Sequence, residues 1–346
     1  MIETRKTPHS LYAIEFLRVF FIFFIILGHI MERYSSVKDT VLNFFNTKYM
    51  QGWFCVEFFF IIGGFFLYLR IQKTTSVNAL VKRIYLRLLP ALVFVFCVCL
   101  LLGTVHRDRF PLILTMTTGL TIPGEATGWG DWYVGSYFWA SCLYVGLFML
   151  CRKQAFIWTF VLMYITICLK FNAPYDGFMK TYYTIVGNQF IRAIYSIGLG
   201  ISAAYLAEKV DLKKNAFTIS IFTILEIMGF LSVFYYIARS SHIHFNFWEM
   251  EIVFALLLIS ISKSFGWVSL TLNSISKIQY ISRYTYSIFL GHIIFIKQLM
   301  SHQSYGLSGT SCALIICGGA TIAGVFEYHI VEKKIMPWII KQFVKE

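Results

Sequence analysis

The chain has 346 residues, of which 58% are hydrophobic and only 14% are charged, and its formal net charge is +13. A soluble domain carries about 25% charged residues, so this composition excludes a soluble protein and predicts a single membrane domain over residues 1–346. The excess of Lys and Arg is typical of loops held on the cytoplasmic side of a membrane. No basic patch stands outside that pattern, so we expect membrane lipid around the chain and no nucleic-acid partner.

Ten apolar windows of about 20 residues follow one another along the chain. They cover residues 11–31, 52–71, 88–105, 132–151, 155–170, 184–207, 217–238, 250–268, 283–300 and 311–331. With both termini on the cytoplasmic side, 19 of the 30 Lys and Arg residues lie on that side, as the positive-inside rule expects. We therefore predict an all-α bundle of about ten transmembrane helices, or an odd number if the fifth window is re-entrant.

The first window carries three ionisable residues in an otherwise apolar run, Glu15, Arg18 and His29. In an α-helix, Arg18 and His29 face nearly the same direction, roughly 16 Å apart along the axis, and Glu15 lies one turn before Arg18. Since an ionised group in the membrane costs about 3 kcal/mol, this stripe should face protein or water.

Two interpretations of the stripe remain open. In the first, Glu15 pairs with Arg18 near the cytoplasmic surface and His29 reaches the outer interface. In the second, the stripe lines a polar shaft through the bundle. His29 then lies near the far end of the shaft, where an imidazole can accept a proton at neutral pH and act as a general base.

The spacing Glu15-x-x-Arg18-x(10)-His29 resembles the opening motif of the membrane acyltransferase-3 family. Further segments resemble motifs of that family in the same order along almost the whole chain. They are "VEFFFIIGGFFL" (56–67), "KRIYLRLLP" (82–90), "DWYVGSYF" (131–138), "ISRYTYSIFLGHIIF" (281–295) and "VEKKIMP" (331–337). Three positions differ from the family pattern. Gly63 replaces a usual Ser, Phe289 replaces a usual Tyr, and Arg83 and Arg87 are four residues apart instead of three.

The resemblance implies an O-acyltransferase in the inner membrane of a bacterium. Such enzymes transfer an acyl group, usually acetyl from acetyl-CoA, onto a hydroxyl of a surface polysaccharide, lipopolysaccharide or similar glycan. Acetyl-CoA is then a donor substrate, and we expect no permanently bound cofactor. The resemblance makes His29 the base, and Arg18 either pairs with Glu15 or binds the donor.

Four basic residues near the second and third windows are candidates for binding the CoA phosphates, because Arg in particular grips phosphate through a bidentate fork. They are Arg83, Arg87, Lys82 and Lys73. Positive-inside topology alone would also place basic residues there. Pro90 suits the start of the third span after this surface segment.

Two ionisable residues lie near the outer ends of their spans. We expect Glu57 either to orient His29, to contact the sugar or to be a plain interfacial carboxylate. Arg192 needs a partner inside the membrane, and either Glu57 or an incoming sugar would serve.

The remaining candidates are aromatic or imidazole side chains. Trp132 and Tyr133 could stack on sugar rings or simply anchor the membrane interface. His292 could contact substrate or be a structurally satisfied buried residue, and we expect Tyr286 and Ser287 to hydrogen-bond between helices. No metal site is predicted, because His242 and His244 lack further ligands nearby.

A transporter for a glycan intermediate or a small anion is the alternative function. Its path would be lined by Glu15, Arg18, His29 and Arg192. Many transporters show inverted repeats with Gly- or Pro-broken spans in matching halves. The sequence shows no such symmetry, so we favour the enzyme.

Overall fold

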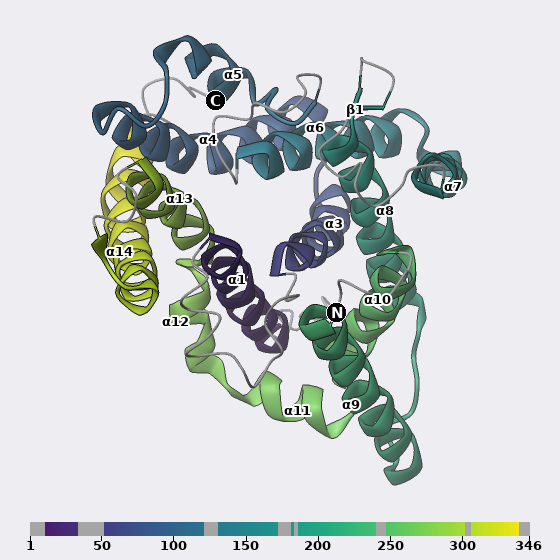
Figure 1. The fold of residues 1–346 in the computed structure, drawn as a ribbon. Coiled ribbons are helices and arrows are strands. Elements are labelled where there is room, and N and C mark those ends of the chain that lie inside the picture. Colours follow the sequence, from purple (N-terminus) through teal and green to yellow (C-terminus); the bar gives the residue numbers. More distant parts are fainter. Residues whose placement is uncertain are drawn as a thin grey trace.

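The computed structural model of the protein describes residues 11–33, 52–120, 131–171, 181–182, 186–239, 247–301 and 306–338. This part of the chain is almost entirely helical (Figure 1). Its α-helices are α1 (Tyr12–Arg33), α3 (Cys55–Ile71), α4 (Val77–Leu101), α5 (Phe110–Thr115), α6 (Asp131–Leu150), α7 (Ala155–Phe171), α8 (Asn188–Lys209), α9 (Ala216–Arg239), α10 (Phe247–Lys263), α11 (Trp267–Ser274), α12 (Gln279–Ser282), α13 (Thr285–Ser301) and α14 (Gly309–Glu327).

Shorter elements connect these helices. Single turns of 3₁₀-helix are η3 (Gly52–Phe54), η4 (Arg107–Arg109), η5 (Arg152–Gln154) and η7 (Ser276–Ile278). The stretch η9 (Tyr328–Ile335), which continues α14, is a π-helix. Strands β1 (Thr181–Tyr182) and β2 (Val186–Gly187) pair antiparallel just before α8. Apart from these two-residue strands, the described residues with regular secondary structure are helical, so the all-α prediction is confirmed for them.

Each of the ten apolar windows coincides with a long helix. Among the described residues, seven helices are long and apolar enough to cross a membrane, or eight if the bent pair of α10 and α11 counts as one broken span. The protein is thus a multi-pass membrane protein. The count of ten stays a prediction, because α3 and α13 have only 17 residues each. The fifth window forms the helix α7, and the stretch Arg152–Leu169 is one of the seven.

Helix α4 begins about ten residues earlier than the third window predicts. Leu80, Ile84 and Leu88 are buried at four-residue spacing, and Ser76 caps the helix by accepting a hydrogen bond from the Ala79 N–H. This apolar stripe extends the helix through the basic segment. Pro90 therefore lies inside α4 and not at its start. The prediction for Pro90 was wrong, because hydropathy averaged over a window cannot detect an amphipathic extension.

Helix α1 occupies the centre of the bundle, where α3, α10, α11, α12, α13 and α14 all contact it (Figure 1). Its exposed side is marked by Phe23, with 57% of its surface accessible. At about 100° per residue, Phe23 points about 140° away from Arg18 and about 120° away from His29. The polar stripe of α1 therefore faces protein.

Helices α3 and α8 pack with their backbones in close approach. A Cβ at Gly64 would overlap the carbonyl of Ile197, and a Cβ at Gly200 would overlap the carbonyl of Ile61. Small residues allow such contacts in membrane proteins, where packing replaces the hydrophobic effect as the driving force between helices. This contact fixes the position of Glu57 on α3 relative to α8.

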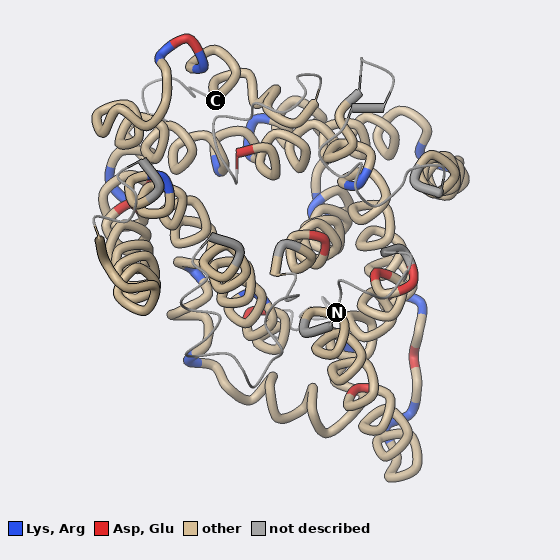
Figure 2. The backbone as a smooth tube through the Cα atoms, viewed as in Figure 1, with Lys and Arg blue, Asp and Glu red and all other residues tan. Residues whose placement is uncertain are grey.

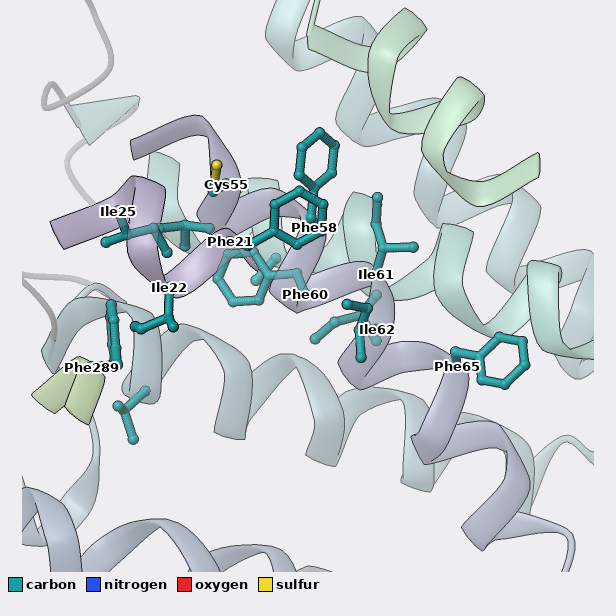
Figure 3. Close-up of a cluster of buried hydrophobic side chains, with 14 of the residues drawn as sticks. Phe21, Ile22, Ile25, Cys55, Phe58, Phe60, Ile61, Ile62, Phe65 and Phe289 are labelled. Atoms are coloured by element: carbon teal, nitrogen blue, oxygen red, sulfur yellow. The ribbon is translucent and has the colours of Figure 1, made fainter. Parts of the chain in front are cut away.

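Apolar side chains of α1, α3 and α13 form the core around this centre. Phe21 of α1 lies 4.7 Å from Phe58 of α3 between ring centroids, and both rings meet Phe254 of α10. Figure 3 shows the α1 and α3 side chains packed together, with Phe289 of α13 beside Ile22. Figure 2 shows that most of the bundle carries no charge and that a few charged residues lie within it.

A buried carboxylate fixes the 61° bend between α10 and α11. Glu226 of α9 accepts hydrogen bonds from the hydroxyl groups of Ser260 and Ser269 and from the N–H groups of Gly266 and Ser269, at 2.6–3.1 Å. These donors belong to the two ends that meet at the bend. The carboxylate therefore satisfies backbone N–H groups that the break in the helix leaves without an intrahelical partner.

The bend in turn anchors the start of α1. The amide oxygen of Asn273 on α11 accepts a hydrogen bond from the Ala13 N–H at 2.8 Å. Its amide nitrogen donates to the Ile261 carbonyl at 3.1 Å and to the Ser264 hydroxyl at 2.7 Å. Asn273 thus acts as a cap supplied by another part of the chain, and it fixes the first turn of the helix that carries Arg18.

Candidate functional site

The polar stripe of α1 combines features of both interpretations drawn from the sequence. Arg18 and Glu15 form an ion pair with 2.9 Å between Nη1 and Oε2, so the predicted pairing exists. Arg18 also lines an internal cavity. It can therefore interact with a ligand while it remains paired, and the two interpretations do not exclude one another.

That cavity, which we call the arginine cavity, has a volume of about 100 Å³. Its polar side chains come from five helices, and its other walls are apolar. The polar residues are Arg18, Arg70, Arg87, Tyr133, Tyr137, Thr285 and Tyr286. The three guanidinium groups lie close enough to repel one another. Glu15 compensates the charge of Arg18, and an anion bound in the cavity would offset positive charge that remains.

The structure selects among the basic residues proposed for phosphate binding. All four residues are exposed, but Arg87 lines the arginine cavity, whereas Lys73, Lys82 and Arg83 do not. Arg70, at the end of α3, also lines it. The basic residues look alike in the sequence, and only the packing of α6 against α3 and α4 shows which of them line the cavity.

Gly63 explains one departure from the family pattern. It lines the arginine cavity, and a Cβ at this position would overlap the ring of Tyr137. A Ser there would require the Tyr137 ring to move. The smaller residue on α3 and the large phenol on α6 therefore fit each other as a pair.

His29 and His292, which we call the histidine pair, meet beyond the end of the arginine cavity formed by Ile25 and Phe289. Their rings are stacked, with 5.4 Å between centroids and 20° between planes. Sequence reasoning singled out both residues but not their contact, because they are 263 positions apart (292 − 29).

The hydrogen bond made by His292 fixes its tautomer. Its Nδ1 is bonded to the carbonyl oxygen of Phe289, which can only accept, so Nδ1 carries the proton. Nε2 of the neutral ring is then an acceptor. It is buried and has no hydrogen-bond partner among the described residues. A buried acceptor left unpaired costs about 1–3 kcal/mol, which a bound hydroxyl group would recover.

Glu57 and Arg192 form an ion pair between α3 and α8, and both are almost completely buried. The hydroxyl of Ser196 bridges this pair to Glu251 of α10, lying 3.0 Å from Glu57 Oε2 and 2.6 Å from Glu251 Oε2. We call these four residues the acidic network. Glu57 is one of the two partners that we expected for Arg192. Among the described residues, no contact between Glu57 and the histidine pair is found.

Of the two aromatic candidates at the start of α6, one contacts the acidic network and the other lines the arginine cavity. The Trp132 ring faces the Arg192 guanidinium, with 5.3 Å from Cζ to the ring centroid. Tyr133 lines the arginine cavity and contacts Phe60 and Phe289. The expected interhelical hydrogen bond of Tyr286 is present, because its hydroxyl donates to the Leu88 carbonyl at 2.8 Å.

Sequence reasoning missed Ser196 and Glu251. Glu251 follows Glu249 by two residues at the polar start of the eighth window, where a carboxylate near the end of a span draws no attention. His242 and His244 lie outside the described residues. Within the described ranges, no three His, Cys, Asp or Glu side chains gather as metal ligands would.

Comparison with known proteins gives one match. A model of the acyltransferase-3 family, described as an acyltransferase domain, matches residues 11–326. No curated protein and no solved structure matches the chain significantly.

Proposed function

Because this chain belongs to the membrane acyltransferase-3 family, we propose that it is an O-acyltransferase that moves an acetyl group from acetyl-CoA onto a carbohydrate hydroxyl, in the inner membrane of a bacterium. The observation that carries the proposal is the arrangement of the arginine cavity and the histidine pair along α1. One end of this helix supplies a guanidinium for an anion, and the other end supplies an imidazole for a proton. The family supports an enzyme over a transporter.

The arginine cavity suits the donor. CoA carries several phosphate charges, and Arg18, Arg70 and Arg87 can bind phosphate oxygens through charge-assisted hydrogen bonds. The apolar walls formed by α1, α3 and α13 suit the uncharged arm that carries the thioester. With the phosphates at the arginine end, this arm extends past Ile25 and Phe289 toward the histidine pair.

The reaction requires one proton to be moved. His29 takes the proton of the acceptor hydroxyl while the hydroxyl oxygen forms a bond to the acyl carbon. The bond between that carbon and the CoA sulfur then breaks, and the proton passes from His29 to the leaving sulfur. The products are the O-acyl carbohydrate and CoA with a free thiol, and no oxidant or metal is needed for the balance.

His292 and the acidic network serve the site in different ways. The stacked ring of His292, held neutral with its proton on Nδ1, orients His29 and presents Nε2 to the incoming hydroxyl. Glu57 and Arg192 position Trp132 and the start of α6. Trp132 then serves the sugar by stacking, Tyr133 lines the cavity of the donor, and Arg192 acts on the sugar only through Trp132.

The test uses purified protein in nanodiscs with radiolabelled acetyl-CoA and a carbohydrate acceptor. We expect His29→Ala to lower the rate of transfer by about 100-fold or more, the usual contribution of general base catalysis. His106→Ala is the matched control, because His106 is exposed and lies outside both cavity and histidine pair. Transfer at the wild-type rate by folded His29→Ala protein would show that His29 is not the base.

A further inference from the structure

A second cavity, which we call the distal cavity, lies between α4, α5, α6 and α13. Its volume is about 20 Å³, and its walls are mostly apolar. Three side chains with functional groups line it, Cys99, Asp131 and Lys297. Asp131 is almost completely buried, and Lys297 is half-buried. An ammonium and a carboxylate inside a membrane bundle are costly, and such groups mark functional sites more often than structural ones.

The distal cavity continues the line of the arginine cavity. On α4, Arg87 and Leu88 line the arginine cavity, and Leu92 through Cys99 line the distal one. Cys99 lies roughly 18 Å beyond Arg87 along the helix axis. On α6, Asp131 lines the distal cavity and Tyr133, two residues later, lines the arginine cavity. The same helices therefore wall both cavities at successive depths.

The histidine pair lies at the level between the two cavities. On α13, Phe289 lines the arginine cavity and Ile293 lines the distal cavity, one helical turn later. His292 follows Phe289 by three residues, so these two are neighbours on the helix surface, and its position along the axis lies between those of Phe289 and Ile293. Its Nε2 is the buried acceptor that lacks a partner among the described residues.

The chemistry of the distal cavity fits a hydroxyl group. A hydroxyl can donate to the carboxylate of Asp131 and accept from the ammonium of Lys297. These two groups are close enough to interact electrostatically. The volume, about that needed by one water molecule, admits a single hydroxyl-bearing group and not a whole sugar ring.

We propose that the distal cavity is the acceptor subsite, where Asp131 and Lys297 bind a hydroxyl-bearing group of the acceptor on the side of the histidine pair opposite the donor. The subsite rests on the proposed acyl transfer. In this arrangement the arginine cavity binds phosphate at one end of α4, and the distal cavity binds a hydroxyl at the other end. The imidazoles lie where the two substrates meet.

The experiment separates donor kinetics from acceptor kinetics. Purified protein receives radiolabelled acetyl-CoA together with either glycerol or methyl glucoside as the hydroxyl probe, and hydrolysis of acetyl-CoA is measured without a probe. The variants are Asp131→Asn and Lys297→Gln. The matched controls are Asp211→Asn and Lys277→Gln, whose side chains are exposed.

We expect both variants to raise the KM for the hydroxyl probe about tenfold or more, the effect of one lost charge-assisted hydrogen bond. The KM for acetyl-CoA and its rate of hydrolysis should not change, which also shows that the variants are folded. The controls should behave as wild type in every measurement.

Two results would overturn the subsite. One is an unchanged KM for the hydroxyl probe in both variants while wild-type protein transfers normally, and this result leaves the acyltransferase proposal intact. The other is wild-type protein that hydrolyses acetyl-CoA but transfers acetyl to neither probe. Wild-type protein that neither transfers nor hydrolyses would instead refute the acyltransferase proposal, and the subsite with it.

Discussion

Arg70 and Arg83 look equivalent in the sequence, but the structure gives them different surroundings. Both are basic residues near the predicted cytoplasmic end of a span. Arg70 lines the arginine cavity, whereas Arg83 is exposed on α4 and does not line it. The family pattern favours Arg83 as a ligand for the donor phosphates, whereas the structure favours Arg70.

This difference gives a direct prediction for donor binding. Arg70→Gln should raise the KM for acetyl-CoA by about 10- to 100-fold, because a charge-assisted hydrogen bond to a phosphate contributes about 1.5–3 kcal/mol. Arg83→Gln is the matched variant and should leave this KM unchanged. Steady-state kinetics with varied acetyl-CoA measure both values. The reverse order of effects would show that the donor does not enter the arginine cavity.

The Glu57–Arg192 pair gives a second prediction, for stability. Glu57→Gln should lower the free energy of unfolding by about 3–5 kcal/mol, because it leaves a buried guanidinium without its carboxylate. Removing both charges in Glu57→Gln with Arg192→Met should cost less than the sum of the two single changes. Denaturant unfolding in detergent measures the cycle. Strict additivity would mean that the two side chains do not stabilise one another.

At the residue scale, the sequence predicted which side chains deserve attention better than it predicted their partners. Arg18, His29 and His292 stand out because polar groups in apolar runs are rare. The stacking of His29 on His292, and the bridge from Ser196 to Glu251, depend on how distant helices pack. No spacing along the chain records such contacts.

At the scale of elements, Asn273 is expected to matter more than its position on a short helix suggests. Asn273→Ala should lower the free energy of unfolding by about 1–2 kcal/mol, as the loss of a helix cap does. It should also raise the KM for acetyl-CoA, since the first turn of α1 positions Arg18.

Asn215→Ala provides the matched control for this prediction. Asn215 also accepts a hydrogen bond from a backbone N–H, that of Thr218 at 2.8 Å, but at the start of the peripheral helix α9. It should reduce stability without changing the kinetics. Equal kinetic effects of the two substitutions would show that α1 is not positioned through the bend.

Helix positions were predictable because a membrane span needs about 20 apolar residues, and every window contains a helix. The ends were less predictable. The amphipathic start of α4 carries too many polar residues to raise the hydropathy of a window, so only its buried stripe of Leu80, Ile84 and Leu88 accounts for it. The bend after α10 was also missed, because Glu226, which stabilises it, lies on another helix.

At the scale of the whole molecule, the predicted orientation can be tested on the two ends of α4. Lys73 precedes this helix and Arg107 follows it, and both are exposed. With the N-terminus in the cytoplasm, Arg107→Cys should react with a membrane-impermeant maleimide in intact cells. Lys73→Cys should react only after the cells are permeabilised. The background is the chain with its eight cysteines replaced by Ser or Ala.

Two outcomes of the labelling would contradict the arrangement. The opposite labelling pattern would show that the protein has the inverted orientation and that the arginine cavity faces outward. Labelling of both positions from the same side would show that α4 does not cross the membrane.

No described residue lines both the arginine cavity and the distal cavity, and the histidine pair and Phe289 lie at the level where one gives way to the other. An energised membrane holds a voltage and an ion gradient, which a continuous water-filled channel would dissipate. In the proposed reaction, walls divided in this way would let the acyl group pass from one side to the other while ions are blocked. Replacing the histidine pair and Phe289 by small side chains would therefore be expected to raise the ion conductance of the protein before it lowered the rate of catalysis.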